Sequence, residues 1–242
     1  MKKLLLWCVL VWWCSAGSLG ASEIVLSKTE VEQGGFFRVT ITNAPPRWVF
    51  LVRFQKKNYR TFTSGDRTQM VLIPVGSMEK LGEAEVYFES ESELIVPRTV
   101  TVVASSVAPE RAMPETFIPS EQESKTLGAF LSRTTPFAFF TEDPVFENPF
   151  TARSALAVDV IAAESGIVRF AGKLPELGDT VVIDHGQELF SVYARLGDTL
   201  VKEADAIPRG FRIGTGNPGK PRFAVRLHGI WIDPRHVRGG TK

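Results

Sequence analysis

One carboxylate and three cations are the candidate functional residues in the C-terminal part of this chain. Asp159 closes the run Ala155–Asp159, Arg195 stands in Tyr193–Leu196, and Lys220 and Arg222 flank a proline. Guanidinium and ammonium groups have no lone pair for a metal, and one carboxylate cannot hold catalytic zinc, which usually takes three protein ligands. The same cations can stabilise negative charge, and an arginine can bind a carboxylate bidentately. These residue types therefore predict anion binding rather than metal-assisted hydrolysis.

The three histidines do not have the spacing of a metal site. His185, His228 and His236 stand far apart in sequence, and none belongs to an H-x-H, H-x-x-x-D or H-E-x-x-H pattern. We interpret them as surface or turn residues. The chain carries 28 Lys and Arg against 27 Asp and Glu, interspersed, with no basic block. This balance gives no indication of a nucleic-acid-binding surface.

The C-terminal motifs resemble the lysostaphin-like, LytM-type zinc endopeptidases, which cut peptide cross-links in bacterial cell walls. The resemblance is carried by GDTVVIDHG, FSVYARL, GFRIGTG, FAVR and IDP, which fall in family order between Gly178 and Pro234. The landmarks of that family read H-x-G-x-D, then Y-A-H-L, then H-L-H-F-E-V. At the histidine positions this chain has Ala155, Arg195, Lys220 and Arg222, and only Asp159 remains.

The resemblance implies an enzyme fold without its catalytic residues. In the family, zinc is held by the His and Asp of the first motif and by the second His of H-L-H. Ala155 offers no donor atom, and Arg222 stands at the other histidine ligand position. We therefore expect no catalytic residue, no metal and no cofactor.

Family geometry would place Asp159 opposite Arg195 and Arg222, with Lys220 nearby. Two interpretations of this arrangement stay open. The cations could pair with the orphaned carboxylate and stabilise the floor of the groove. Alternatively, they could form a groove that binds an acidic peptide, a wall stem peptide or an acidic segment of a partner.

The N-terminus has the pattern of a secretory signal peptide, which we assign to residues 1–21. Lys2 and Lys3 precede a short apolar run that ends in small residues. Both cysteines, Cys8 and Cys14, lie in this segment, so the mature chain would contain none; lipidation at Cys14 is an alternative. We expect a periplasmic or secreted protein with no transmembrane span after signal removal.

The remainder reads as an all-β protein: an N-terminal Ig-like β-sandwich followed by a LytM-type antiparallel β-sheet domain. Residues 22–105 form the sandwich, with a partly opened barrel as the alternative, because short β-branched and aromatic runs alternate with turn signals. Residues 106–135 form a linker in which Ser120–Glu123 has a capping-box pattern that predicts a short helix. Residues 136–242 form the peptidase-like domain. The expected strands are 36–42, 48–54, 68–74, 83–89 and 95–103, then 157–162, 166–170, 180–183, 190–193, 199–201 and 223–227.

Three functions follow from these features. The first is a non-catalytic cell-envelope factor that binds peptidoglycan or regulates a cell-wall hydrolase such as an amidase, a role that the resemblance implies. The second is a zinc endopeptidase that cuts cell-wall cross-links with unusual ligands. The third is a structural subunit of a secreted complex that uses the Ig-like domain as its interaction surface.

Overall fold

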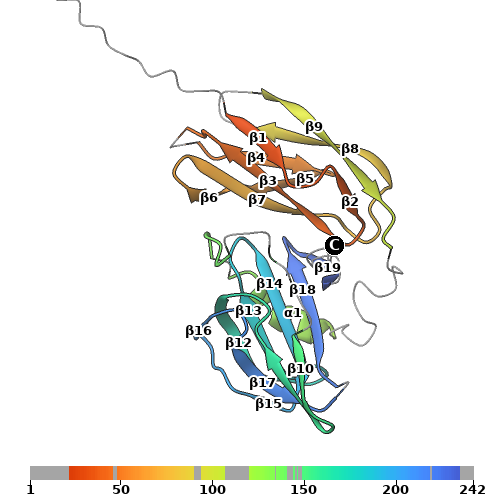
Figure 1. The fold of residues 1–242 in the computed structure, drawn as a ribbon, viewed down its shortest axis with the longest axis vertical. Coiled ribbons are helices and arrows are strands. Elements are labelled where there is room, and N and C mark those ends of the chain that lie inside the picture. Colours follow the sequence, from red (N-terminus) through yellow and green to blue (C-terminus); the bar gives the residue numbers. More distant parts are fainter. Residues whose placement is uncertain are drawn as a thin grey trace, which may run out of the picture.

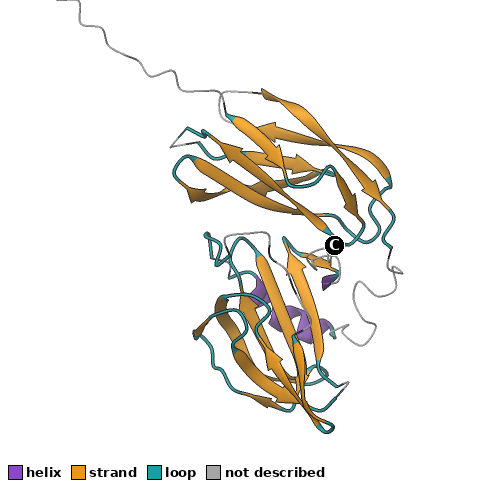
Figure 2. Cartoon of the chain, in the orientation of Figure 1, coloured by secondary structure: helices purple, strands orange, loops and turns teal. Residues whose placement is uncertain are grey.

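The computed structural model describes residues 22–45, 48–89, 94–106, 120–133, 135–140, 144, 146, 149–218 and 220–234. Within these residues the chain consists of strands and one short helix, in two units stacked along the long axis of the molecule (Figures 1 and 2). The predicted all-β class is therefore confirmed. The expected signal peptide, both cysteines and His236 lie outside the described residues. No helix in the described ranges has the length and hydropathy needed to span a membrane.

The N-terminal unit consists of two sheets that enclose one apolar core. One sheet has the order β1-β3-β7-β6 and the other β2-β9-β8-β4-β5, in which β2 and β9 pair in parallel. Alternate residues such as Val86 and Phe88 of β8 are buried, whereas Glu83 and Glu85 are exposed, as the alternation in the sequence predicts. The strands are β1 (Glu23–Leu26), β2 (Glu30–Glu32), β3 (Phe36–Thr42), β4 (Leu51–Phe54), β5 (Lys57–Arg60), β6 (Phe62–Gly65), β7 (Thr68–Pro74), β8 (Gly82–Glu89) and β9 (Leu94–Val103).

Helix α1 (Glu121–Leu131) follows the predicted capping box. The Ser120 hydroxyl accepts from the backbone N–H of Glu123, and the Glu123 carboxylate accepts from the N–H of Ser120 at 3.3 Å. The same carboxylate accepts from the N–H groups of Glu176 at 2.7 Å and Leu177 at 3.2 Å. Burial would raise the pKa of Glu123, but these backbone hydrogen bonds outweigh it and lower the pKa. The charged end of the helix is thus fixed to the C-terminal unit.

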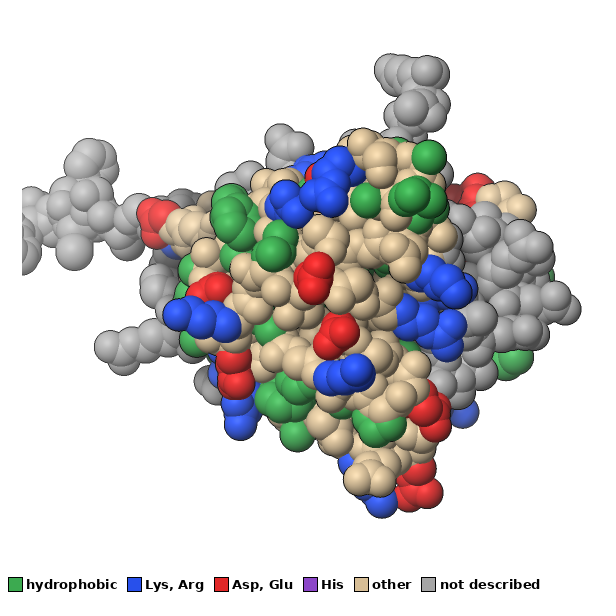
Figure 3. Space-filling view, turned by 90° about the horizontal axis from the view of Figure 1, so that it is seen from below, with side chains coloured by type: hydrophobic (Ala, Val, Ile, Leu, Met, Phe, Trp, Pro, Cys, Tyr) green, Lys and Arg blue, Asp and Glu red, His purple; other side chains and the backbone are tan. Residues whose placement is uncertain are grey.

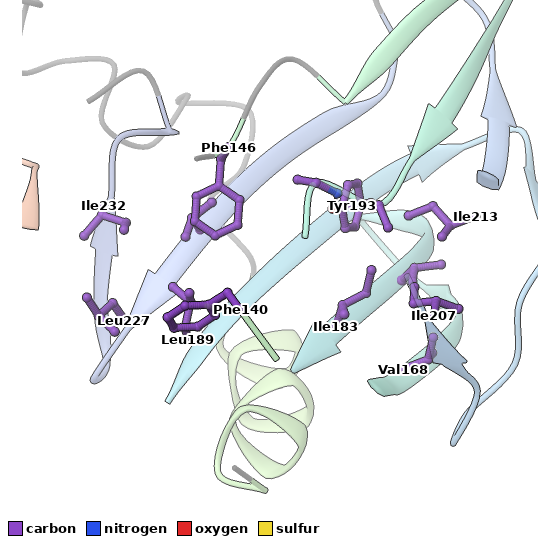
Figure 4. Packing of buried hydrophobic residues seen from close by; sticks show 14 of the residues in the cluster. Phe140, Phe146, Val168, Ile183, Leu189, Tyr193, Ile207, Ile213, Leu227 and Ile232 are labelled. Atoms are coloured by element: carbon purple, nitrogen blue, oxygen red, sulfur yellow. Dashed lines mark hydrogen bonds between the residues drawn. The ribbon is translucent and has the colours of Figure 1, made fainter. Parts of the chain in front are cut away.

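The C-terminal unit contains a four-stranded sheet, β10-β11-β17-β15, and a six-stranded sheet, β16-β12-β13-β14-β18-β19. Residues from both sheets share one apolar cluster, which includes Val160, Ile183, Tyr193 and Ile213 (Figure 4). On its other face the larger sheet packs against Leu127 and Leu131 of α1. The strands are β10 (Phe150–Ser154), β11 (Ala157–Ile161), β12 (Gly166–Leu174), β13 (Gly178–Asp184), β14 (Leu189–Leu196), β15 (Asp198–Thr199), β16 (Ala206–Ile207), β17 (Arg212–Gly216), β18 (Arg222–Leu227) and β19 (Ile230–Ile232).

The two units share apolar packing rather than meeting only through the chain that connects them. Phe36, Met70 and Leu72 of the N-terminal sandwich belong to the same buried cluster as Leu227 and Ile232. At this junction the ring of Tyr59 meets the ring of His228 edge to face, with centroids 5.1 Å apart. The backbone N–H of Asp233 also donates to the carbonyl of Gly34 at 2.9 Å.

Candidate functional site

Asp159 lies in the middle of β11, with its side chain on the face opposite to the buried Val158 and Val160. One carboxylate oxygen is 3.0 Å from Nε of Arg212 on β17 and 3.6 Å from the guanidinium of Arg153 on β10. That oxygen is buried and accepts no hydrogen bond of good geometry. Its contacts with Arg153 and Arg212 are therefore ion pairs without hydrogen bonds. The ion pairs of Asp159 within the described residues are therefore with Arg153 and Arg212 rather than with Arg195 and Arg222. The alternation of side chains along β11 puts the carboxylate on the outer face of the sheet, where arginines from the adjacent strands β10 and β17 reach it.

Arg195 occupies a β-bulge near the end of β14. Asp179 pairs with Leu196 and Val181 with Tyr193, so two residues of β14 oppose one residue of β13. Arg195 has a φ of 56°, its N–H donates to the carbonyl of Leu177 at 2.7 Å, and its side chain is exposed. A non-glycine residue in this conformation costs about 1–3 kcal/mol, and a bulge re-aims the side chain that it carries.

Lys220 and Arg222 lie at the start of β18, next to the end of β14 that carries Arg195. Arg222 begins β18 and pairs in register with Ala194, the residue before Arg195. The guanidinium of Arg222 donates to the carbonyl oxygens of Lys220 and Pro221 at 3.2 and 3.1 Å. The structure thus brings the backbones of the three predicted cations to one end of the β14–β18 pair, with Asp159 on a different sheet.

Pro221 fixes the start of β18 against the smaller sheet. A Cβ added to Gly216 would lie 2.5 Å from Cγ of Pro221, so only glycine permits this close approach. Gly216 pairs with Val158 of β11, one residue before Asp159. The contact therefore holds the cation-bearing strand end next to the sheet that carries Asp159.

The surface of this unit mixes charges of both signs. Figure 3 views the molecule from below Figure 1, and Lys and Arg side chains alternate there with Asp and Glu side chains. Ala155, at the expected position of a histidine ligand, is an exposed turn residue between β10 and β11. Within the described ranges, no three His, Cys, Asp or Glu side chains lie close enough to hold a metal ion together.

His185 lies in the connection between β13 and β14 and is a buried structural residue, so the interpretation as a surface residue is wrong. It has no exposed surface, and its ring nitrogens lie 2.8 Å from the carbonyl of Ser165 and 2.8 Å from the hydroxyl of Ser191. Burial lowers the pKa of His185 to about 4, although the Ser165 hydrogen bond opposes this shift. The imidazole is therefore neutral at pH 7. Its position at the end of the apolar run VVID was the signal for burial.

His228 lies in the β18–β19 turn, as predicted, but it also contributes to the junction between the units. Its Nδ1 is 3.2 Å from the Glu188 carboxylate, and its ring contacts Tyr59. The side-chain hydrogen bond from His228 lowers the pKa of Glu188. This imidazole is engaged in structural contacts.

A buried polar network that the sequence reasoning missed lies around Asp184, at the end of β13. One carboxylate oxygen accepts from the Arg169 guanidinium at 2.7 Å and from the N–H and hydroxyl of Thr135 at 2.9 and 2.7 Å. The other oxygen accepts from the N–H of Gly186 at 2.8 Å. The network is structural, because its hydrogen bonds join the end of β13 to β12, to the turn that follows β13, and to the segment after α1.

Comparisons with known proteins identify the C-terminal unit. The profile of Peptidase family M23 matches residues 151–234. A solved structure assigned to peptidase M23 from Pseudomonas aeruginosa is 20% identical, covers 86% of this chain and 95% of its own, and superposes with a TM-score of 0.61. At that identity the likeness shows a shared fold alone. No curated protein matched the chain.

Two further solved structures give weaker matches. The complex of SpoIIIAH and SpoIIQ is 31% identical over 34% of this chain and 62% of the matched chain, with a TM-score of 0.32. Csd3 from Helicobacter pylori is 13% identical over 84% of this chain and 71% of its own, with a TM-score of 0.37. The profile match places a Peptidase family M23 domain at residues 151–234, within the C-terminal unit.

Proposed function

We propose that this protein is a non-catalytic factor of the cell envelope whose M23 domain binds peptidoglycan or regulates a cell-wall hydrolase. The observation that carries the proposal is the set of residues at the histidine positions of the family motifs. Ala155 has no donor atom, and Arg195, Lys220 and Arg222 are cations without a lone pair for zinc. A metal-bound water is the nucleophile that such a domain would need for hydrolysis.

The position of Asp159 supports the same proposal. Its carboxylate faces Arg153 and Arg212, so the remaining family ligand already has positively charged neighbours. A zinc ion at this carboxylate would have to displace them. M23 domains act in the cell envelope, so the expected signal peptide is consistent with this location for the chain.

The cations at the end of the β14–β18 pair supply the binding surface in this proposal. The bulge at Arg195 and the register of Arg222 place two guanidinium-bearing residues on adjacent strands. Acidic groups of a wall peptide or of a partner are suitable ligands, because arginine binds carboxylates through paired, charge-assisted hydrogen bonds.

The test combines metal analysis with wall assays on the full mature protein. We expect purification without stoichiometric zinc, no release of peptides from peptidoglycan, and sedimentation of the protein with insoluble peptidoglycan. The double variant Arg195→Glu with Arg222→Glu should lose sedimentation, whereas Arg60→Glu with Arg98→Glu, an equal change of charge on the N-terminal sandwich, should keep it.

Three results would overturn the proposal. Stoichiometric zinc with chelator-sensitive release of wall peptides would establish the endopeptidase alternative. Failure to bind peptidoglycan and failure to stimulate a wall amidase would together leave the structural-subunit alternative. Equal sedimentation of the parent and of the double variant Arg195→Glu with Arg222→Glu would show that the cations are not the binding surface.

A further inference from the structure

The N-terminal sandwich has a polar pocket of about 330 Å³ on the solvent face of β8. Its wall comes from three segments: the β4–β5 turn, the loop before β8, and β8 itself. Glu83, Glu85 and Tyr87 alternate along β8 with the buried Val86 and Phe88, so their side chains share the outward face. The pocket is far in sequence from the M23 domain and takes no residue from it. Gln55, Lys56, Lys80, Leu81 and Ala84 complete its polar and apolar lining.

The turn that carries two of the lining residues is strained. Phe54 pairs with Lys57, which leaves Gln55 and Lys56 as a two-residue hairpin loop with φ angles of 47° and 65°. Loops of this geometry favour Asn-Gly, because both positions need the left-handed region. The chain instead places two long side chains there, and both line the pocket. Strain of this kind is concentrated at binding sites, where a side chain must be presented in one direction.

Contacts on β8 hold the opposite wall in place. The Tyr87 hydroxyl donates to the Glu85 carboxylate. The guanidinium of Arg53 lies over the Tyr87 ring, 4.8 Å from its centroid, and pairs with Glu89 at 3.2 Å. A wall whose side chains are already ordered loses less conformational entropy when a ligand binds.

We propose that this pocket binds a saccharide. Its lining has two ammonium groups and two carboxylates, so a strongly charged ligand would meet like charges as well as opposite ones. Hydroxyl groups both donate and accept, so a sugar can satisfy Lys and Gln donors and Glu acceptors together. An apolar ligand would leave those groups without partners. The half-exposed Leu81 and the Tyr87 ring supply apolar surface for the C–H face of a sugar ring.

The site is independent of the cations of the M23 domain, so the two can be tested separately. The probe is chitotetraose, a neutral tetramer of N-acetylglucosamine, added to the isotope-labelled mature chain and followed by amide chemical shifts. We expect millimolar or tighter binding, with shifts confined to the β4–β5 turn and β8. Lys56→Ala should weaken binding about tenfold, whereas Lys57→Ala, its neighbour outside the lining, should leave binding unchanged.

The strained turn provides a second test. Gln55→Asn with Lys56→Gly restores the residues that such a turn favours, so it should raise the melting temperature and weaken chitotetraose binding. Full binding by this variant would overturn the proposal, as would no shift at millimolar probe. Binding lost in Arg195→Glu with Arg222→Glu but kept in Lys56→Ala would place the sugar site on the M23 domain. Shifts in the pocket with the tripeptide Ala-Glu-Lys but not with chitotetraose would show a peptide site and refute the saccharide assignment.

Discussion

Asp159 shows how a single carboxylate can keep its place in a motif and still serve a different purpose. Its side chain lies on the same face of the sheet as Arg153 of β10 and Arg212 of β17. These ion pairs are partly exposed to solvent. Exposed ion pairs of this kind contribute about 0–1 kcal/mol to stability. Asp159 is therefore a minor structural residue in the present chain.

Restoring the two histidines of the family ligand set should not restore zinc binding. We expect Ala155→His with Arg222→His to bind zinc no more tightly than the parent in a calorimetric titration, because Asp159 faces two arginines instead of the restored pair. Tighter binding that disappears on adding Asp159→Ala would contradict this expectation and show that the carboxylate can turn toward a metal.

His185 should make the fold sensitive to acid. Its pKa is about 4 in the folded protein and about 6.5 in an unfolded chain, so the unfolded state binds the proton more readily between these values. Stability is therefore fully present above pH 6.5 and decreases as the pH falls toward 4, by roughly 3 kcal/mol from this group.

Urea unfolding at pH 7 and pH 5, with imidazole signals followed by NMR, checks the prediction. The His185 signals should not titrate between pH 7 and pH 5. A His185 ring that titrates near pH 6.5, together with equal urea midpoints at both pH values, would refute it.

At the scale of elements, the hydrogen bonds of one carboxylate stabilise α1 more than its own backbone hydrogen bonds do. Glu123 accepts from the N–H groups of Glu176 and Leu177 as well as from the N-cap residue. A helix of 11 residues has little stability in isolation, so these bonds and the packing of Leu127 and Leu131 fix it to the sheet.

Glu123→Ala should lower the free energy of unfolding by about 1–3 kcal/mol, because the buried N–H of Leu177 and the part-buried N–H of Glu176 lose their acceptor. Glu121→Ala, a matched change on the exposed side of the same turn, should cost less than about 0.5 kcal/mol through its pair with Lys125. Equal effects of the two changes in urea unfolding would show that the bridge from α1 to Glu176 and Leu177 contributes nothing.

The longer strands and the helix could be predicted from the sequence, whereas the short strands and the pairing of strands could not. Strands such as β3 and β7 match the predicted bounds, because their β-branched and aromatic runs are bordered by turn signals. The capping box at Ser120 also gave the helix start. The strands that were not predicted have five residues or fewer, and one of them, Lys57–Arg60, has little apolar character. They are β1, β2, β5, β6, β10, β16, β17 and β19.

The candidate site was harder to predict, because side-chain direction depends on register. The motif order gave the positions of Arg195 and Arg222 on neighbouring strands. It gave no information on which face of β11 carries Asp159, or on the partners β10 and β17 that supply Arg153 and Arg212. His185 was misjudged for a related reason, since its burial comes from residues distant in sequence, such as Phe146.

At the scale of the whole molecule, the junction between the sandwich and the M23 domain is part of the core. Leu72 of β7 has no exposed surface and belongs to the cluster that includes Leu227 and Ile232. A two-domain chain whose units share such a cluster is expected to unfold cooperatively.

Leu72→Asp should separate the unfolding of the two units. The parent should show one transition by calorimetry, whereas the variant, with a charge buried at the junction, should show two. Thr99→Asp, at an exposed position of β9 in the other sheet of the sandwich, provides the control and should keep one transition. Two transitions in the parent would show that the shared cluster does not couple the units.

The packing of Phe36, Met70 and Leu72 against the M23 domain also has a consequence for avidity. A saccharide bound on β8 and an acidic group bound at the β14–β18 strand end would belong to one body, so their separation would be set by the fold instead of a tether. A ligand that presents both groups at the matching distance gains the second contact as an intramolecular step, whereas one with another spacing gains nothing. The shared core would then make the chain select ligands by the distance between their sugar and acidic groups, in addition to the chemistry of each group.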